Sequence, residues 1–304
     1  MHILVVGGGM GGTILANNLA RRLSGELEQG SSKITMLSAS DKHMYQPGLL
    51  YVAVGKMSTS ELYRDQKSLL ESSIDFHVDP VEKFDLDNNS VTTKSGKKIS
   101  YDILCIATGS RGNAEGIPGL AENSCQFYTE ADAVAMYKKL SKFEGGKVVV
   151  ATGVPHKCPM SPLEITFFLI DYFKKRGIWD KVDLHYTYPI GRVHSLAPVA
   201  EWAAPEFDKE GVTYETLFNM KEVVPGKVIS EEDSSAEFDL LVTVPPHKGM
   251  QVIEDNELGK GGFIPTDKKK LNMEGRDNVF VLGDTTNLPI SKAGSTAHFE
   301  AEAL

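Results

Sequence analysis

The chain has 304 residues, of which 41% are hydrophobic and 24% charged, so its composition is that of a globular protein large enough for two domains. A formal net charge of −9 with no basic stripe argues against nucleic acid as a partner. No apolar stretch reaches the length of a transmembrane helix. The first predicted strand begins at residue 2, so we expect no secretory signal before the fold.

The first dozen residues predict a strand, a glycine turn and a helix. Residues 2–6 form an apolar run, Gly7, Gly9 and Gly12 occupy the GxGxxG positions, and residues 13–23 are apolar at helical spacing. The first glycine allows a tight turn, the second lets backbone approach a pyrophosphate, and the third lets helix and strand pack closely. We therefore predict a dinucleotide site whose phosphates meet the helix N-terminus. The alternative is a glycine-rich loop without a ligand.

The next segments predict a second parallel strand and a loop. Residues 33–37 are apolar, and the end of such a strand normally carries an acidic residue that binds ribose hydroxyls. Ser38 and Ala39 stand there instead, and we expect Ser38 to hydrogen-bond the ribose. Pro47 lies in a predicted loop that could lie against a ring of the bound cofactor. Residues 60–72 predict a helix with Ser60 as its N-cap.

Short strands are predicted at 74–81, 90–93 and 97–100, as an antiparallel appendage. Two longer apolar strands follow later in the chain. The strand at 101–106 ends in Ala107-Thr108-Gly109, where small residues let backbone pass close to a ligand. The strand at 278–282 ends in Gly283-Asp284, whose carboxylate can hold ligand hydroxyls.

Residues 291–298 open a last predicted helix, whose N-terminal N–H groups could stabilise negative charge on a bound cofactor. The chain ends at Leu304 within this helical pattern, so we expect a C-terminal segment to be missing.

The chain resembles the flavoproteins with two dinucleotide-binding domains. It carries three of their markers in the same order: GxGxxG at 7–12, Ala-Thr-Gly at 107–109 and Gly-Asp at 283–284. The resemblance implies an α/β fold with two Rossmann-like domains: a split FAD domain at 1–115 and 272–304, and a second domain at 116–271. It implies FAD as the cofactor. The expected FAD-binding residues are Gly7, Gly9, Met10, Gly12, Ser38, Ala39, Pro47, Ala107, Thr108, Gly109, Gly283, Asp284, Lys292, Gly294, Thr296 and Ala297.

The turn after the first strand of the second domain lacks the glycines of an NAD(P)H site. After residues 147–151 it reads Thr152-Gly153-Val154-Pro155-His156-Lys157-Cys158-Pro159. Proline and bulky residues keep a pyrophosphate from the backbone. We expect Cys158 to lie at a helix start and to be a low-pKa thiolate, because His156 and Lys157 flank it. The alternative is an inert loop cysteine. Cys105, inside an apolar strand, is expected to be buried.

Residues 156–159, 162–164 and 174–177 are similar to sulfide:quinone oxidoreductases. This resemblance implies oxidation of hydrogen sulfide through cysteine persulfides, with electrons passing to FAD and then to a membrane quinone. It implies peripheral attachment to the cytoplasmic face of a membrane through the C-terminal segment, and a possible homo-oligomer.

In that family two cysteines flank the flavin. Cys158 matches one of them, and the other lies beyond the end of this chain, so the chain is expected to be incomplete for turnover. Cys125 matches an auxiliary cysteine. Glu164 or His194 could manage protons; the alternatives are a helix-face carboxylate and a surface-loop histidine.

Three other functions remain open from the sequence. A type II NADH:quinone dehydrogenase shares the fold, FAD and quinone, but the altered second turn weighs against it. A flavocytochrome c sulfide dehydrogenase subunit would bind a haem protein and normally carries a secretory signal. The third is a non-catalytic FAD-binding sensor.

Overall fold

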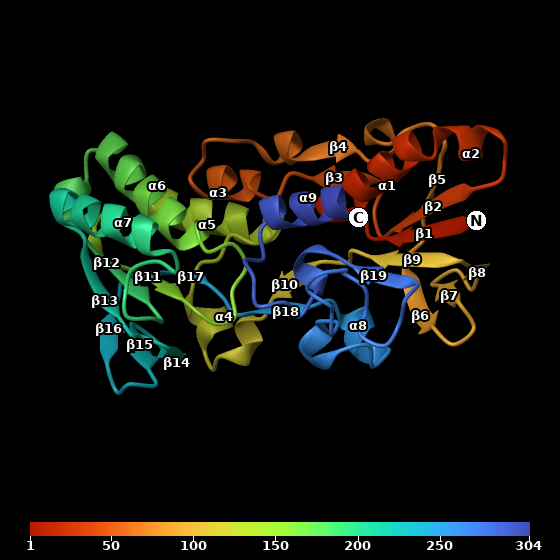
Figure 1. Cartoon of the computed structure of the whole chain (residues 1–304). Helices are drawn as coiled ribbons and strands as arrows, with labels where there is room; N and C mark the ends of the chain where they lie inside the picture. The colour runs from red at the N-terminus through yellow and green to blue at the C-terminus, as the bar shows by residue number, and fades with distance from the viewer. The chain divides into compact units, whose positions relative to one another are not determined.

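The computed structural model describes all 304 residues, which form two compact units. The first unit contains residues 1–44, 63–111 and 248–304, and the second contains residues 45–62 and 112–247. Each unit has its own parallel sheet with helices packed on it (Figure 1). This architecture confirms the expected α/β fold with two Rossmann-like parts.

The first unit is built on a five-stranded parallel sheet in the order β19-β9-β1-β2-β5. Leu4 and Val5 in the central strand have no exposed surface, as expected for a parallel strand covered on both faces. The strands are β1 (His2–Val6), β2 (Lys33–Ser38), β5 (Ile74–Val78), β9 (Ile103–Ile106) and β19 (Val279–Val281).

Helices α1 (Met10–Arg22) and α9 (Gly294–Ala303) lie side by side on one face of this sheet (Figure 1). The Asn18 side chain donates a hydrogen bond to the Ala301 carbonyl at 3.4 Å, and Ala301 belongs to the same apolar core as the inner face of α1. The C-terminal helix thereby covers the helix that follows the glycine turn. The shorter helices of this unit are α2 (Ser24–Glu28) and α8 (Gln251–Asp255).

An antiparallel appendage of three strands, β6 (Val81–Asp85), β7 (Ser90–Thr93) and β8 (Lys98–Ser100), belongs to the same unit. The predicted strand at 74–81 was wrong in extent: its first part is β5 of the parallel sheet, and β6 begins a new sheet.

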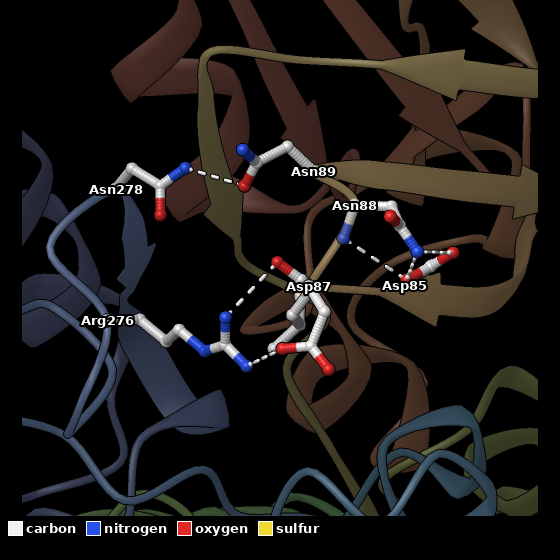
Figure 2. A network of polar contacts seen from close by, with 7 residues as sticks. Asp85, Asp87, Asn88, Asn89, Arg276 and Asn278 are labelled. Carbon is white, nitrogen blue, oxygen red and sulfur yellow. Dashed lines mark hydrogen bonds and ion pairs between the residues drawn. The ribbon is translucent and has the colours of Figure 1, made fainter.

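Polar contacts tie the β6–β7 turn to the segment before β19 (Figure 2). Arg276 donates to the Asp87 carboxylate and to the Leu86 carbonyl. The Asn278 amide donates to Asn89 at 2.9 Å. Segments far apart in sequence are therefore joined at this edge of the first unit.

The chain leaves the first unit between β3 (Lys42–Met44) and β4 (Tyr63–Asp65), which pair with each other. The intervening residues contain α3 (Gly48–Ala53), which begins after Pro47. The helix predicted at 60–72 is wrong, because β4 occupies its centre and only short 3₁₀ turns flank it. Pairing with β3 overrides the local helical pattern.

The second unit has a four-stranded parallel sheet in the order β13-β12-β11-β17, and a separate antiparallel sheet of β14, β15 and β16. The strands are β11 (Gly146–Thr152), β12 (Val182–Tyr188), β13 (Thr213–Thr216), β14 (Met220–Val224), β15 (Lys227–Ser230), β16 (Ser235–Glu237) and β17 (Leu240–Val244).

No helix of the chain is both long enough and apolar enough for a membrane span. The helices after α3 are α4 (Leu120–Asn123), α5 (Glu130–Lys142), α6 (Ser161–Lys175) and α7 (Ala197–Glu210). The chain passes between the units near β10 (Ser110–Gly112) and β18 (His247–Gly249).

Candidate functional site

The glycine turn of the first unit connects β1 directly to α1. A β-carbon on Gly7 would lie 2.2 Å from the Ala107 carbonyl oxygen, and one on Gly12 would lie 2.0 Å from the Gly7 carbonyl oxygen. A β-carbon on Gly9 would meet nothing within 4 Å. Gly7 and Gly12 are therefore required for packing, whereas Gly9 faces open space at the N-terminus of α1. This is the space that a pyrophosphate takes in such a fold.

The two later signatures meet beside this turn because β19 pairs with β9. The Gly109 backbone N–H donates to the Thr285 hydroxyl at 2.7 Å, and the Ser110 hydroxyl donates to the Asp284 carboxylate at 2.8 Å. Thr108 also lies next to Thr285, at 3.4 Å between hydroxyl oxygens. The structure thus brings together the predicted segments 107–109 and 283–284.

The start of α9 completes this group. A β-carbon on Gly294 would lie 3.0 Å from the Met10 sulfur, and one on Gly283 would lie 3.2 Å from the Ala297 β-carbon. Thr296 is partly exposed on the same first turn of α9. These close approaches seat the start of α9 against both the glycine turn and the Gly283-Asp284 segment.

Lys292 precedes α9. Its ammonium group donates to the carbonyls of Asp284, at 3.2 Å, and Thr286, at 2.7 Å. It also lies 4.4 Å from the centre of the Phe263 ring. Lys292 therefore fixes the loop that carries Asp284, and it brings positive charge to the start of α9.

Ser38 is buried beneath the glycine turn. Its hydroxyl accepts the Ser40 backbone N–H at 3.2 Å, and a β-carbon on Gly8 would lie 2.4 Å from that hydroxyl. Only 7% of Ser38 is exposed, whereas the neighbouring Ala39 is exposed. Ser38 therefore packs against the turn. Its hydrogen bond to a ribose stays a prediction, and little of its surface is open to a ligand.

Three polar residues that sequence reasoning missed form a network behind the turn. Gln66 has no exposed surface and donates to the Thr13 hydroxyl at 2.9 Å. His43 Nδ1 lies 3.1 Å from both the Gly8 carbonyl oxygen and Gln66 Oε1. Because β3 and β4 bring these residues together across an excursion of the chain, no local sequence signal could have identified them.

Cys158 lies in the second unit, in the loop of residues 153–160 between β11 and α6. The predicted low thiol pKa is wrong: burial, and next the Glu164 carboxylate, raise the pKa of Cys158 above its usual value. The backbone N–H groups of Met160 and Ser161 and the charge of Lys157 act in the opposite direction but are weaker. Cys158 also precedes α6, which begins at Ser161.

The histidines of this region are both uncharged at neutral pH. Burial lowers the pKa of His156 to about 4, so it supplies no positive charge to Cys158. His194 was considered as a surface-loop residue, but it has no exposed surface; burial lowers its pKa, and its Nδ1 accepts the Leu196 backbone N–H at 3.0 Å. Its ring stacks with Tyr188, at 6.5 Å between ring centres.

The remaining predicted residues have different settings. Cys125 is 5% exposed, and its backbone bonds to Leu241 and Thr243 extend the parallel sheet beside β17. Burial raises the thiol pKa of Cys125. Glu164 lies on the first turn of α6, and burial raises the pKa of its carboxyl group. Pro47 precedes the first residue of α3 and belongs to the second unit. Its contact with a flavin ring stays a prediction.

The glycine turn, the open position at Gly9 and the buried Asp284 are together the site of a dinucleotide-binding protein. The family model "Pyridine nucleotide-disulphide oxidoreductase" matches residues 1–301, and the chain belongs to that family. The cofactor is FAD, as expected from the resemblance. The open space at Gly9 fits its pyrophosphate, and Asp284 fits a hydroxyl-bearing part of it.

Two mitochondrial sulfide:quinone oxidoreductases are similar to nearly the whole chain. The protein of Dictyostelium discoideum is 29% identical over 321 residues, covering 99% of this chain and 69% of the relative. The protein of Mus musculus is 29% identical over 318 residues, covering 100% and 69%. The crystal structure of the Aquifex aeolicus sulfide:quinone oxidoreductase has the same fold, with a TM-score of 0.84 at 24% identity, covering 99% of this chain and 75% of that one.

Proposed function

We propose that this flavoprotein oxidises hydrogen sulfide and passes the electrons through FAD to a quinone. The two mitochondrial relatives that are 29% identical over nearly its whole length are named for this reaction. The residues that resemble the sulfide:quinone oxidoreductases, 156–159 and 162–164, lie in one loop and the helix that follows it.

The observation that carries the proposal is the difference between the two β–α turns. In the first unit only Gly7, Gly8 and Gly9 separate β1 from α1. In the second unit residues 153–160 separate β11 from α6, and Pro162 removes an N–H from the first turn of that helix. A pyrophosphate binds to close backbone with free N–H groups, and this longer turn offers it fewer of them. The loop carries Cys158 instead.

Oxidation of hydrogen sulfide requires a group that accepts the sulfur and an acceptor for two electrons. Addition of sulfur from hydrosulfide to the Cys158 thiol gives a persulfide, one proton and two electrons. FAD is the two-electron acceptor that this reaction needs, and the quinone takes up the two electrons and two protons to become a quinol. The resemblance implies a second cysteine that shares the sulfur, and Cys125 is proposed as an auxiliary thiol.

Glu164 is proposed to take up the proton released near Cys158. Its carboxylate is close enough to raise the thiol pKa, and burial raises its own carboxyl pKa toward neutrality. His194 is proposed as a second proton carrier; its buried imidazole is neutral at pH 7 and able to accept a proton. We also propose peripheral attachment to a membrane, where a quinone is dissolved, and self-association of the chain.

The test is anaerobic reduction of the bound flavin, followed by loss of its absorbance near 450 nm after mixing with sulfide or with NADH. We expect saturable bleaching by sulfide and little by NADH. Fast, saturating bleaching by micromolar NADH would instead support an NADH:quinone dehydrogenase. In matched variants, Cys158→Ser should lose reduction by sulfide while Cys105→Ser retains it. Normal sulfide reduction in Cys158→Ser would exclude that residue as the redox cysteine.

A further inference from the structure

The end of β2 lacks the group that usually binds the adenosine ribose. In this fold the ribose lies beside the glycine turn at the end of the second strand, where an acidic side chain accepts its hydroxyl hydrogen. Ser38 holds that position and is buried under Gly8, with its hydroxyl already accepting the Ser40 N–H. Because so little of Ser38 is exposed, another residue at the rim of the turn is better placed to accept the ribose hydroxyl.

His43 lies at this rim, because β3 follows directly after the end of β2. Its Nδ1 is 3.1 Å from the carbonyl oxygen of Gly8 and 3.1 Å from the side-chain oxygen of Gln66. The amide nitrogen of Gln66 donates to the Thr13 hydroxyl at 2.9 Å. The amide atom that faces His43 is therefore the oxygen.

These two neighbours fix the tautomer of His43. Both atoms near Nδ1 are oxygens that can only accept, so Nδ1 must carry the hydrogen. In the neutral imidazole Nε2 then carries the lone pair and is an acceptor. Nε2 has no hydrogen-bond partner in the protein, and the His43 side chain is partly exposed.

The same contact orients the phosphate-binding backbone. The Gly8 carbonyl receives the His43 Nδ1–H and, at 3.4 Å, the Thr13 hydroxyl. In a trans peptide the carbonyl and the following N–H point in opposite directions. Holding the Gly8 carbonyl toward His43 therefore turns the Gly9 N–H away from His43, Gln66 and Thr13.

We propose that His43 binds the adenosine ribose of FAD, accepting a ribose hydroxyl at Nε2 in place of the missing acidic residue while Nδ1–H holds the Gly8 carbonyl. The proposal rests on the FAD site alone. It does not depend on whether sulfide or another donor reduces the flavin.

The test measures FAD affinity of the apoprotein by quenching of flavin fluorescence. FAD is compared with two analogues that lack the 2′- or the 3′-hydroxyl of the adenosine ribose. The wild-type protein should bind one analogue about 3- to 10-fold more weakly, the range of one ordinary hydrogen bond. In His43→Asn, the asparagine amide can still donate to Gly8 but leaves no acceptor at the Nε2 position. This variant should bind FAD about 3- to 10-fold more weakly and should no longer distinguish the analogues.

The matched control is His77→Asn, which changes another partly exposed histidine of the same unit and should leave FAD affinity and discrimination unchanged. Retention of the full deoxy-analogue penalty in His43→Asn would overturn the proposal. So would loss of the penalty in Asp41→Asn or Ser38→Ala with His43 intact.

A second measurement does not require a variant that folds. The ¹⁵N NMR spectrum of histidine-labelled apoprotein should show His43 protonated at Nδ1, with its Nε2 signal shifting when FAD, but not the discriminated analogue, is added. A neutral His43 protonated at Nε2 would overturn the proposal.

Discussion

The carboxylate of Glu300 accepts a hydrogen bond from the backbone N–H of Gly283. Gly283 has a φ of +68°, which glycine adopts without strain, and the next residue is Asp284. Glu300 is only 8% exposed, and burial raises the pKa of its carboxyl group. Helix α9 therefore holds the Gly283-Asp284 segment through a buried ionisable group.

Glu300→Gln should make the protein more stable at pH 8 than the wild type. The folded-state pKa of Glu300 is raised, so its contribution to stability is present below the unfolded pKa and is lost as pH rises through the folded pKa. The glutamine oxygen still accepts the Gly283 N–H without a buried charge. We expect the difference in Tm between the two FAD-loaded proteins to shrink toward pH 4.5. A variant less stable than the wild type at pH 8 would contradict this account.

Replacing Gly9 should abolish FAD binding without unfolding the protein. Gly9 has φ −78° and ψ −173°, which any residue adopts, and a β-carbon there meets nothing. Gly9→Leu should purify folded but colourless, because its side chain takes the pyrophosphate space.

Gly12→Ala is the contrasting variant for Gly9→Leu. A β-carbon at Gly12 would lie 2.0 Å from the Gly7 carbonyl oxygen, so the turn must shift and the protein should lose on the order of 1–3 kcal/mol of stability. The ratio of flavin to protein absorbance and a thermal melt separate the two effects. A yellow Gly9→Leu protein would remove this residue from the FAD site.

The sequence predicted the elements whose signal is local. The strands predicted at 2–6 and 33–37 match β1 and β2, because continuous apolar runs are typical of parallel strands buried on both faces. The resemblance also implied one FAD site for the glycine turn, segment 107–109 and Asp284, and the structure brings these parts together. Parallel strands align their carboxyl ends, so the sheet gathers them at one edge.

The sequence could not predict features that depend on burial and distant pairing. His156 and Lys157 flank Cys158 in sequence, yet burial leaves His156 uncharged, and burial together with Glu164 raises the Cys158 pKa. The contact of His43 with Gln66 exists only because β3 pairs with β4 across residues 45–62. The sign of a pKa shift and the partners of a buried amide are set by the folded chain.

The protein should lose stability as pH falls from about 6.5 to about 4, in part because of His156. Its imidazole pKa is lowered to about 4 in the folded state, chiefly by burial. Protonation therefore favours the unfolded chain throughout that range. The upper limit is about 3 kcal/mol, reduced because the ring is partly open to water.

His156→Gln should flatten this pH dependence, measured as ΔG of unfolding by urea at pH 7 and pH 5. His298→Gln is the control, since His298 is a partly exposed residue that pairs with Glu302 on α9. An unchanged slope in His156→Gln would show that this imidazole does not carry the acid sensitivity.

Cys158 should be the first thiol to react with iodoacetamide, and Glu164 should slow that reaction. Cys105 is 3% exposed with a pKa raised to about 12 by burial, and Cys125 is 5% exposed, so both should resist modification until the protein unfolds. Cys158 is partly exposed, and its pKa is raised by burial and then by the Glu164 carboxylate.

Glu164→Gln removes that negative charge, lowers the thiol pKa and increases the thiolate fraction at pH 7. A several-fold faster modification of Cys158 is therefore expected, with roughly tenfold corresponding to one pKa unit. Mass spectrometry of peptides over a time course measures each thiol separately, and Glu61→Gln, a carboxylate of the same unit on a different segment, is the matched control. If Glu164→Gln reacts no faster than the wild type while Glu61→Gln also leaves the rate unchanged, the Glu164 carboxylate does not act on Cys158, and its proposed role as the nearby proton acceptor fails with it.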